Sequence, residues 1–431
     1  YFTSLSGENQ LVGIDKGSFY EVMYQALIGR LNYSYADRYL LEAQFRYDGS
    51  SKFAPGHQWG FFPSVSAGWR ISEEPFFKDS ALSFINQLKI RASYGVLGDD
   101  NSMNYEWISG YTFRGGETAG DGKGWHQGYA PGYMFNGNFV YSVDPSSLPN
   151  QNITWLRSTT FNIGADFEAW RGKLGASFDY FQRIRRGIFS RNSVGLPTIV
   201  GASAPYENLD SDSHLGLELE LYHKNRVGEF SYEVKTMMSV TRQKHLVASQ
   251  NGGYGNSYDK WRHDNLNNRY QGVQFGYEAA GRYESWEDIW SYDIYKENNL
   301  LPGDYKYLDW NGDGEINGYD AHPIAFDQTP WMNYSLSFSL AWKGLDFSML
   351  WQGSALGSMK YSEPLYNIWG STGGGTLVQY LDRWHPTETG ADIYDPETEW
   401  IPGYYGFTGH YPDENSSFNR VSTAFLRLKS V

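Results

Sequence analysis

Residues 309–320 read DWNGDGEINGYD, an acidic stretch whose oxygen-bearing side chains are spaced like the ligands of a calcium loop. Gly314 takes the sixth position of an EF-hand loop, where a sharp turn is needed. Ca²⁺ requires about six or more hard oxygen ligands, which alternate residues of a tight loop can supply. The candidate metal-binding residues are Asp309, Asn311, Asp313, Glu315, Asn317 and Asp320.

An ion-free turn explains the same residues. Asx and Gly residues form tight turns without any metal, and no helical pattern flanks the stretch. Asp320 also stands where an EF-hand loop has the longer, bidentate Glu. Both interpretations, calcium loop and plain turn, stay open from the sequence.

Aromatic side chains in expected surface loops form a second set of candidates, because exposed rings stack on sugar rings and peptide side chains. The alternative is that large loops bury their own aromatics as local cores, which we favour for any single residue. The weak candidates for substrate contact are Trp125, Tyr129, Trp261 and Trp286, and the same two interpretations apply to Tyr133, Tyr254, Tyr270 and Trp290.

A cluster of three arginines, Arg183, Arg185 and Arg186, lies near the expected outer end of a strand. It could contact lipopolysaccharide, but a solvated cluster is the favoured interpretation. Catalysis finds little support, because the sequence has no HExxH, no GxSxG with triad partners and no Gly-rich phosphate loop before a helix. We therefore expect no enzyme and no cofactor other than Ca²⁺.

The composition narrows the class of protein. A net charge of -14 argues against nucleic acid as a partner. The absence of Cys excludes disulfides and thiolate metal sites. The sequence has no run of about 18 apolar residues, so it predicts no membrane-spanning helix. A transmembrane β-barrel is still compatible with it, because such a barrel is recognised by alternation rather than by mean hydropathy.

Alternation of apolar with small or polar residues runs through most of the chain and predicts about eleven strands long enough to cross a membrane at a tilt. In MNYSLSFSLAWKGLDFSMLWQG, residues 332–353, two such strands share a tight Lys343-Gly344 turn. The expected strands cover residues 31–35, 39–47, 65–71, 88–96, 161–167, 174–180, 215–221, 230–240, 332–342, 345–353 and 425–431.

Short and long connections alternate between these strands, with residues 72–87 as the one ambiguous connection. An up-and-down barrel with one tight rim and one elaborate rim produces this order, whereas a Greek-key sandwich has no reason to do so. The short turns lie at 36–38, 171–173, 224–228 and 343–344. The expected extracellular loops are approximately 49–58, 97–157, 185–212, 243–330 and 356–422.

The two faces of the strands differ in a way that favours a membrane barrel over a soluble sandwich. Gly, Ser, Asn and Ala alternate with the apolar residues, which suits a crowded, wet interior with lipid outside. Tyr and Trp fall at strand ends, as in aromatic girdles. The predicted fold class is all-β, an antiparallel up-and-down transmembrane β-barrel.

Several segments resemble the SusC/RagA-type TonB-dependent transporters of Bacteroidetes outer membranes. The densest is GRLNYSYADRYLLEAQFRYDGSSKFAPGHQWGFFPSVSAGWRISEE, residues 29–74. LKIRASYGVLGDDN, PGDYKYLDWNGDGEINGYD and the terminal FLRLKSV are also similar to family motifs. NLDSDSHLGLELEL departs from its family counterpart, because Asp210 stands where Gly is usual.

This resemblance implies a protein about twice as long, with a 22-stranded barrel and an N-terminal plug that contacts TonB. The chain would be part of the barrel domain over residues 1–431, without the plug, and we expect the natural protein to continue in both directions. An open fragment would leave unpaired edge strands, so we do not expect it to fold alone.

The function implied by the resemblance is energised import of a large nutrient, an oligosaccharide or a peptide, across the bacterial outer membrane. The implied partners are a SusD-like surface lipoprotein, TonB, outer-membrane lipid and the substrate, and a dimer of transporter–lipoprotein pairs is one arrangement left open. The alternatives are a barrel that serves as a scaffold or passive channel, and a soluble glycan-binding β-protein.

Overall fold

The computed structural model of the chain describes residues 21–100, 105–113, 132–141, 143–145, 148–192, 196–197, 200, 202–249, 257–295, 299–361, 377–407, 410, 412–413 and 415–431. Strands dominate these ranges. None of the helices within them is long and apolar enough to cross a membrane.

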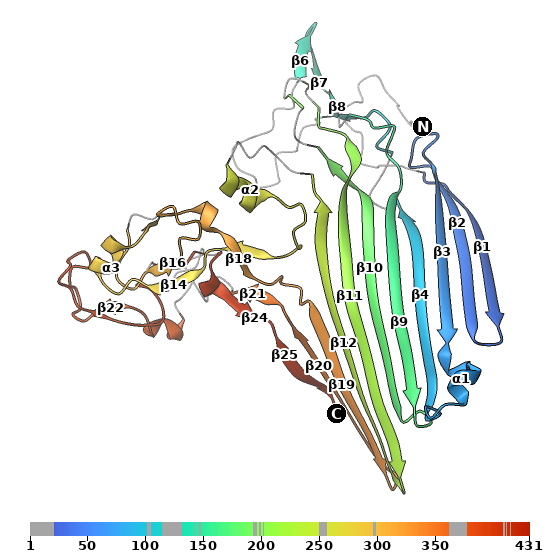
Figure 1. Ribbon diagram of the computed structural model, residues 1–431. Coiled ribbons are helices and arrows are strands. Elements are labelled where there is room, and N and C mark those ends of the chain that lie inside the picture. The colour runs from blue at the N-terminus through green and yellow to red at the C-terminus, as the bar shows by residue number, and fades with distance from the viewer. Residues whose placement is uncertain are drawn as a thin grey trace.

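Eleven strands form one antiparallel sheet, here called the wall (Figure 1). Their order along the sheet follows the chain, which confirms the predicted number of strands and the up-and-down order. In the described residues, β1 and β25 are the two edges. The wall strands are β1 Tyr24–Tyr35, β2 Tyr39–Ser50, β3 Trp59–Arg70, β4 Ile85–Asp99, β9 Leu156–Ala169, β10 Leu174–Arg191, β11 Tyr206–Val227, β12 Phe230–Val247, β19 Met332–Trp342, β20 Leu345–Ala355 and β25 Phe425–Ser430.

Tight turns close one rim of the wall. Lys343 and Gly344 have φ of 49° and 83° between β19 and β20, the paired positive φ values that fit the twist of a two-residue hairpin. The ambiguous connection 72–87 belongs to this rim, where η1 (Ile71–Glu73) and α1 (Pro75–Lys78) lie beside the turns (Figure 1).

The two faces of the wall stay distinct across neighbouring strands, because residues that pair in register lie on the same face. One continuous row across six strands is apolar, and the next row along the same strands is polar. The apolar row is Ile90, Ala165, Phe178, Leu219, Met238 and Tyr334. The polar row is Arg91, Gly164, Asp179, Glu218, Ser239 and Asn333.

The loop rim carries the remaining elements. The two longest connections, after β12 and after β20, pack together through backbone bonds such as Tyr277 N–H to Asn415 O and Ser417 N–H to Tyr277 O. We call the described residues 257–330 and 377–420 the lobe (Figure 1). The elements of the loop rim are β5 Tyr111–Phe113, β6 Gly132–Phe135, β7 Asn138–Tyr141, β8 Val143–Pro145, α2 Tyr258–Asp264, β13 Gln274–Gly276, β14 Ala279–Arg282, α3 Trp286–Ser291, β15 Ile294–Tyr295, β16 Tyr305–Tyr307, β17 Glu315–Ile316, η3 Gly318–Asp320, β18 His322–Ala325, β21 Ser358–Lys360, η4 Val378–Leu381, β22 His385–Pro386, β23 Trp400–Ile401, η5 Ser417–Asn419 and β24 Arg420–Ser422.

The connection expected at 185–212 is shorter than the sequence indicates. β10 continues to Arg191 and β11 begins at Tyr206, because polar side chains pair these strands beyond the apolar band. Arg185 and Asp212 form a salt bridge there. Asp210, at the position where the related motif has Gly, accepts hydrogen bonds from Ser249 N–H and Oγ–H at 2.6 Å each.

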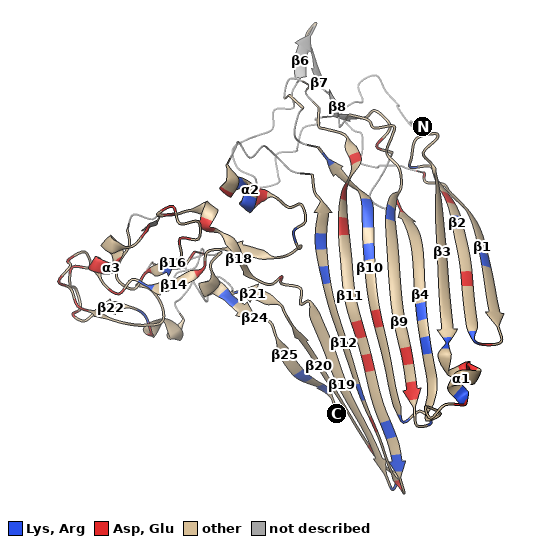
Figure 2. Cartoon of the chain, viewed as in Figure 1, with Lys and Arg blue, Asp and Glu red and all other residues tan. Residues whose placement is uncertain are grey.

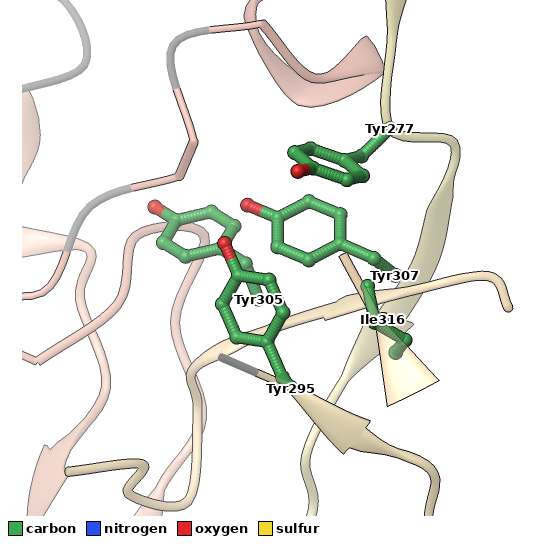
Figure 3. Packing of buried hydrophobic residues seen from close by; sticks show 5 residues of the cluster. All are labelled: Tyr277, Tyr295, Tyr305, Tyr307 and Ile316. Atoms are coloured by element: carbon green, nitrogen blue, oxygen red, sulfur yellow. The ribbon is translucent and has the colours of Figure 1, made fainter. Parts of the chain in front are cut away.

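Buried apolar clusters in the described residues lie toward the loop rim. One contains Phe53, Phe62, Ile153 and Trp155. The other is the centre of the lobe, four tyrosines around Ile316 (Figure 3). The apolar side chains in the middle of the wall join neither cluster.

Candidate functional site

The polar face of the wall carries an ordered network of charges. Arg91 on β4 donates two parallel hydrogen bonds to the Asp179 carboxylate on β10, at 2.5 and 2.6 Å. Its Nε also reaches Asp166 on β9 at 3.2 Å. Such bidentate pairs fix geometry as well as charge. One guanidinium therefore ties three strands together from the side opposite the apolar row.

Gly164 makes room for this network. It lies in register with both Arg91 and Asp179, and a Cβ there would come within 2.7 Å of Asp179 Oδ1 and 2.8 Å of Arg91 Cζ. The small residue in the alternating pattern thus leaves space that the long side chains of neighbouring strands occupy.

Further polar pairs continue along the same face. Lys235 Nζ lies 2.7 Å from Glu220 Oε1, and Gln243 Nε2 donates to Asp212 Oδ2 at 3.0 Å. Figure 2 shows acidic and basic positions interspersed along the middle strands. The face offers donors and acceptors of both signs, which suits a water-filled passage.

Two hollows open mainly on the polar face. One, of about 390 Å³, is bordered by Asp179, Glu218 and Gln352 among others. The second, of about 530 Å³, is bordered by Glu42, Arg91 and Asn162. Polar side chains contribute to the lining of both, so the hollows can hold water or other groups that bear hydroxyls and amides.

The lobe has a core built from tyrosines (Figure 3). Tyr307 is 2% exposed, and its hydroxyl accepts a hydrogen bond from the Asp413 N–H at 2.7 Å. Burial raises the pKa of Tyr305 and of Tyr307. The Arg282 guanidinium stacks 3.8 Å from the Tyr305 ring centre. The Tyr307 hydroxyl and one face of the Tyr305 ring are therefore occupied within the lobe.

A cavity of about 900 Å³ lies where the lobe meets β12. Of the predicted aromatic candidates, Trp261 and Tyr270 line it. Phe275, Trp310 and Trp331 were missed by sequence reasoning, because nothing in the sequence indicates that side chains up to about 90 positions apart share one cavity. The lining residues are Arg242, Trp261, Arg262, Asn265, Asn267, Asn268, Arg269, Tyr270, Val273, Phe275, Trp310, Ala321, His322, Pro323, Ile324, Ala325, Phe326 and Trp331.

The other aromatic candidates do not join this cavity in the described residues. Trp286 and Trp290 lie together in α3, with ring centres 6.0 Å apart. Trp125, Tyr129 and Tyr254 lie outside the described residues, as does the side chain of Tyr133. Their predicted role in substrate contact stays a prediction.

The acidic loop 309–320 is a hydrogen-bonded turn. Asp309 accepts from Gly312 N–H at 2.7 Å and Gly314 N–H at 2.8 Å. Burial raises the pKa of the Asp309 carboxyl, but these backbone bonds outweigh it and hold the pKa below its usual range. The buried Asp320 accepts from the N–H groups of Trp310, Asn311 and Asn317.

Both oxygens of Asp320 are thus engaged, while the Asp313 and Glu315 carboxylates remain near the surface. Within the described ranges, no group of three or more His, Asp or Glu side chains is arranged to hold a metal ion. Calcium binding by this loop stays a prediction.

The three clustered arginines lie on two different faces. Arg185 pairs with Asp212, and Arg183, two positions before it, lies 3.1 Å from His214 Nδ1. Arg186 is one position further along the strand and therefore lies on the other face, where it pairs in register with Arg157 of β9. Alternation, applied to these three residues, separates Arg186 from the other two.

Comparison with known proteins gives consistent matches. The family model described as "TonB dependent receptor-like, beta-barrel" matches residues 5–292. TonB-dependent receptor P26 of Formosa agariphila is 27% identical over 404 residues, which cover 91% of this chain and 38% of that protein. TonB-dependent receptor SusC of Bacteroides thetaiotaomicron is 29% identical over 328 residues, covering 74% and 30%. The chain thus spans less than two fifths of these relatives.

Solved structures show the same fold. The RagAB peptide transporter superposes with a TM-score of 0.67 at 17% identity, covering 95% of this chain and 40% of that one. The RagAB peptide importer in its open-open state gives a TM-score of 0.68 at 18% identity, with the same coverage.

Proposed function

The chain belongs to the family of TonB-dependent receptor-like β-barrels, and we propose that the protein it forms part of imports a large nutrient, an oligosaccharide or a peptide. The wall is part of a SusC/RagA-type barrel of the bacterial outer membrane. Active import, the cargo and the partners are proposed, because the chain spans only part of its relatives.

One observation carries the proposal: apolar and polar rows are separated in register across the wall. Leu217 and Phe178 are each 43% exposed on the apolar face, and hydrocarbon is the environment that accepts such a surface. A water-soluble glycan-binding protein would leave this face uncovered. The opposite face, with its fixed ion pairs and polar hollows, supports passage of a hydrated cargo.

The polar face suits oligosaccharides and peptides equally. Its hollows combine carboxylates such as Glu218 with the amides of Asn333 and Gln352, which can bond to hydroxyl groups or to peptide units. We propose that these groups exchange short-lived hydrogen bonds with the cargo, and that the chain's role is transport without catalysis. The relatives' names, which are those of receptors, transporters and importers, support this.

Two partners complete the proposal. TonB would supply the energy through a plug domain, in keeping with the TonB dependence in the relatives' names. A SusD-like lipoprotein would cover the extracellular side, where the long connections and the lobe lie. Affinity purification of the full-length protein from its host should recover such a lipoprotein, and its absence would contradict this part of the proposal.

Uptake by intact cells tests the import function. The host strain and a strain lacking the full-length gene are given a defined mixture of glycan hydrolysates and peptides, and depletion from the medium is followed by mass spectrometry. We expect at least one glycan or peptide series to remain in the medium of the deletion strain, and also in that of wild-type cells treated with a protonophore.

The alternatives give different results in the same experiment. Uptake that needs the gene but persists with the protonophore indicates a passive channel. No difference between the strains indicates a scaffold within another outer-membrane assembly. Either result contradicts active import.

A further inference from the structure

The cavity between the lobe and β12 is basic, although the chain carries a net charge of -14. Three arginines line it, Arg242, Arg262 and Arg269, and the described residues that line it include no Asp or Glu. The rest of the lining is mostly aromatic and aliphatic. A cavity of this kind fits a ligand that has both an anionic group and an apolar body.

Two of these arginines are engaged by the lobe itself. Arg262 donates to the Tyr319 carbonyl at 2.7 Å, and Arg269 donates to the His263 carbonyl at 2.6 Å. Their guanidinium groups cap loop carbonyls and hold the cavity's shape. They are therefore not the groups that an incoming anion would find available.

Arg242 differs from both. Its guanidinium lies between two rings, 3.5 Å from the centre of Tyr270 and 4.0 Å from that of Trp331. Its Nε is buried without a hydrogen-bond partner, and in the described part of the chain no carboxylate pairs with Arg242. A buried guanidinium donor without a partner is costly unless an acceptor, such as an anion, completes it.

Arg242 lies on the lipid side of the sheet. Its neighbour Gln243 bonds to Asp212 on the polar face, so Arg242 shares the opposite face with Val240 and with its register partner Leu215. Arg242 follows directly on the apolar run of β12. This places the basic end of the cavity where the hydrocarbon band gives way to lipid headgroups.

Other cations continue along this face at the loop rim. Lys244 follows Arg242 on β12, and Arg186 of β10 and Arg157 of β9 are in register with each other. Within the described ranges none of them forms a salt bridge, and their register partners on this face include no acid. Figure 2 shows basic positions near these ends of β9, β10 and β12.

We propose that this surface, Arg242 and Lys244 with the adjoining cavity, binds a phosphorylated glycolipid of the outer leaflet. The two cations take the phosphate through charge-assisted hydrogen bonds. Trp331, Phe326 and Ile324 contact the apolar body of the lipid. Charge complementarity and continuity with the lipid-facing wall favour this occupant over a soluble cargo. The proposal rests on the membrane placement of the wall and not on the identity of the cargo.

Retention of lipid A by the full-length protein is the test. The protein is placed in phosphatidylcholine nanodiscs that contain a small fraction of lipid A, and bound lipid is counted by native mass spectrometry. The double variant R242Q/K244Q should lose binding roughly tenfold or more, since each contact to a charged group is strong. R183Q, which removes an exposed cation of β10 from the polar face of the wall, is the matched control and should bind like the wild type.

Two further arms define the ligand. Dephosphorylated lipid A should bind as weakly to the wild type as lipid A binds to R242Q/K244Q, and R242K should recover part of the binding. Heat-modifiable mobility on gels checks that each variant is folded, and R242Q alone replaces the double variant if that one is not. Lipid counts do not depend on uptake, so this proposal and the import function fail separately.

Four results would overturn the proposal: equal retention by R242Q/K244Q and wild type, equal binding of dephosphorylated lipid A, displacement of lipid A by inorganic phosphate alone, or displacement by soluble anionic oligosaccharides. The last two would assign the surface to a free anion or to cargo.

Discussion

The wall and the lobe place their apolar side chains in opposite ways. The lobe encloses a core of them, with Tyr307 at 2% exposure among other rings. The wall leaves them outside, so that Leu217 and Phe178 are each 43% exposed while Arg91 and Asp179 pair on the other face. The lobe can therefore remain ordered in water, whereas the wall needs hydrocarbon to complete it.

The largest effect should come from opening the core of the lobe. Tyr307→Ala removes a buried ring and leaves a cavity, which typically costs about 3–5 kcal/mol for large aromatic residues. We expect hydrogen exchange in the full-length protein to accelerate throughout residues 274–325 and to be unchanged in β9 to β12. Tyr394→Ala, at a 59% exposed position, is the control and should change little. Equal loss of protection in wall and lobe would mean that the two regions are not separate.

The second largest effect should come from placing a charge on the lipid side of the wall. Leu217→Arg should lower the free energy of unfolding in lipid vesicles by about 2–4 kcal/mol, the cost of Arg near the bilayer midplane. Ser239→Arg, on the polar face, is the matched control and should cost much less. Urea titration of refolded full-length protein measures both, and similar costs at the two positions would contradict the assignment of faces.

The distinction between faces could be predicted from the sequence, because a strand places alternate side chains on opposite sides. The same rule separates Arg186 from Arg183 and Arg185, although the three look like one cluster in the sequence. Strand ends were less predictable. The charged residues of 185–212 indicate a loop, but in the structure Arg185 and Asp212 form a cross-strand pair.

The cavity could not be predicted, because it depends on how long connections fold. Arg242 comes from a wall strand, Trp261 from α2, and Trp331 lies just before β19. No local period links these positions. Trp261 and Tyr270 were identified as loop aromatics, but the unpaired Arg242 between Tyr270 and Trp331 emerges only from tertiary structure.

A smaller effect should come from the ion-pair network of the wall. Arg91→Gln leaves Asp179 and Asp166 without their main partner, at a cost of roughly 1–3 kcal/mol for a partly buried charged group. Arg30→Gln removes a more exposed pair with Glu42 and should cost less than about 1 kcal/mol. If both variants unfold at the wild-type urea concentration, the network does not stabilise the wall.

The smallest effect should come from calcium at residues 309–320. Because Asp320 already accepts backbone hydrogen bonds, we expect weak binding, with a stabilisation of the lobe of about 1.4 kcal/mol at a concentration roughly tenfold above Kd. Calorimetry of the full-length protein after chelation, with Asp313→Asn as the control, measures it. No heat and no stabilisation would leave the plain turn.

The central claim is that one side of the wall contacts lipid and the other contacts water. Neighbouring residues test it most directly, and the chain has no Cys of its own. Glu218→Cys and Leu219→Cys are placed singly in the full-length protein in liposomes and exposed to a water-soluble thiol reagent and to a lipid-phase reagent. We predict that the cysteine at 218 reacts with the water-soluble reagent and the cysteine at 219 with the lipid-phase reagent. The reverse pattern, or equal labelling of both by the water-soluble reagent, would contradict the account.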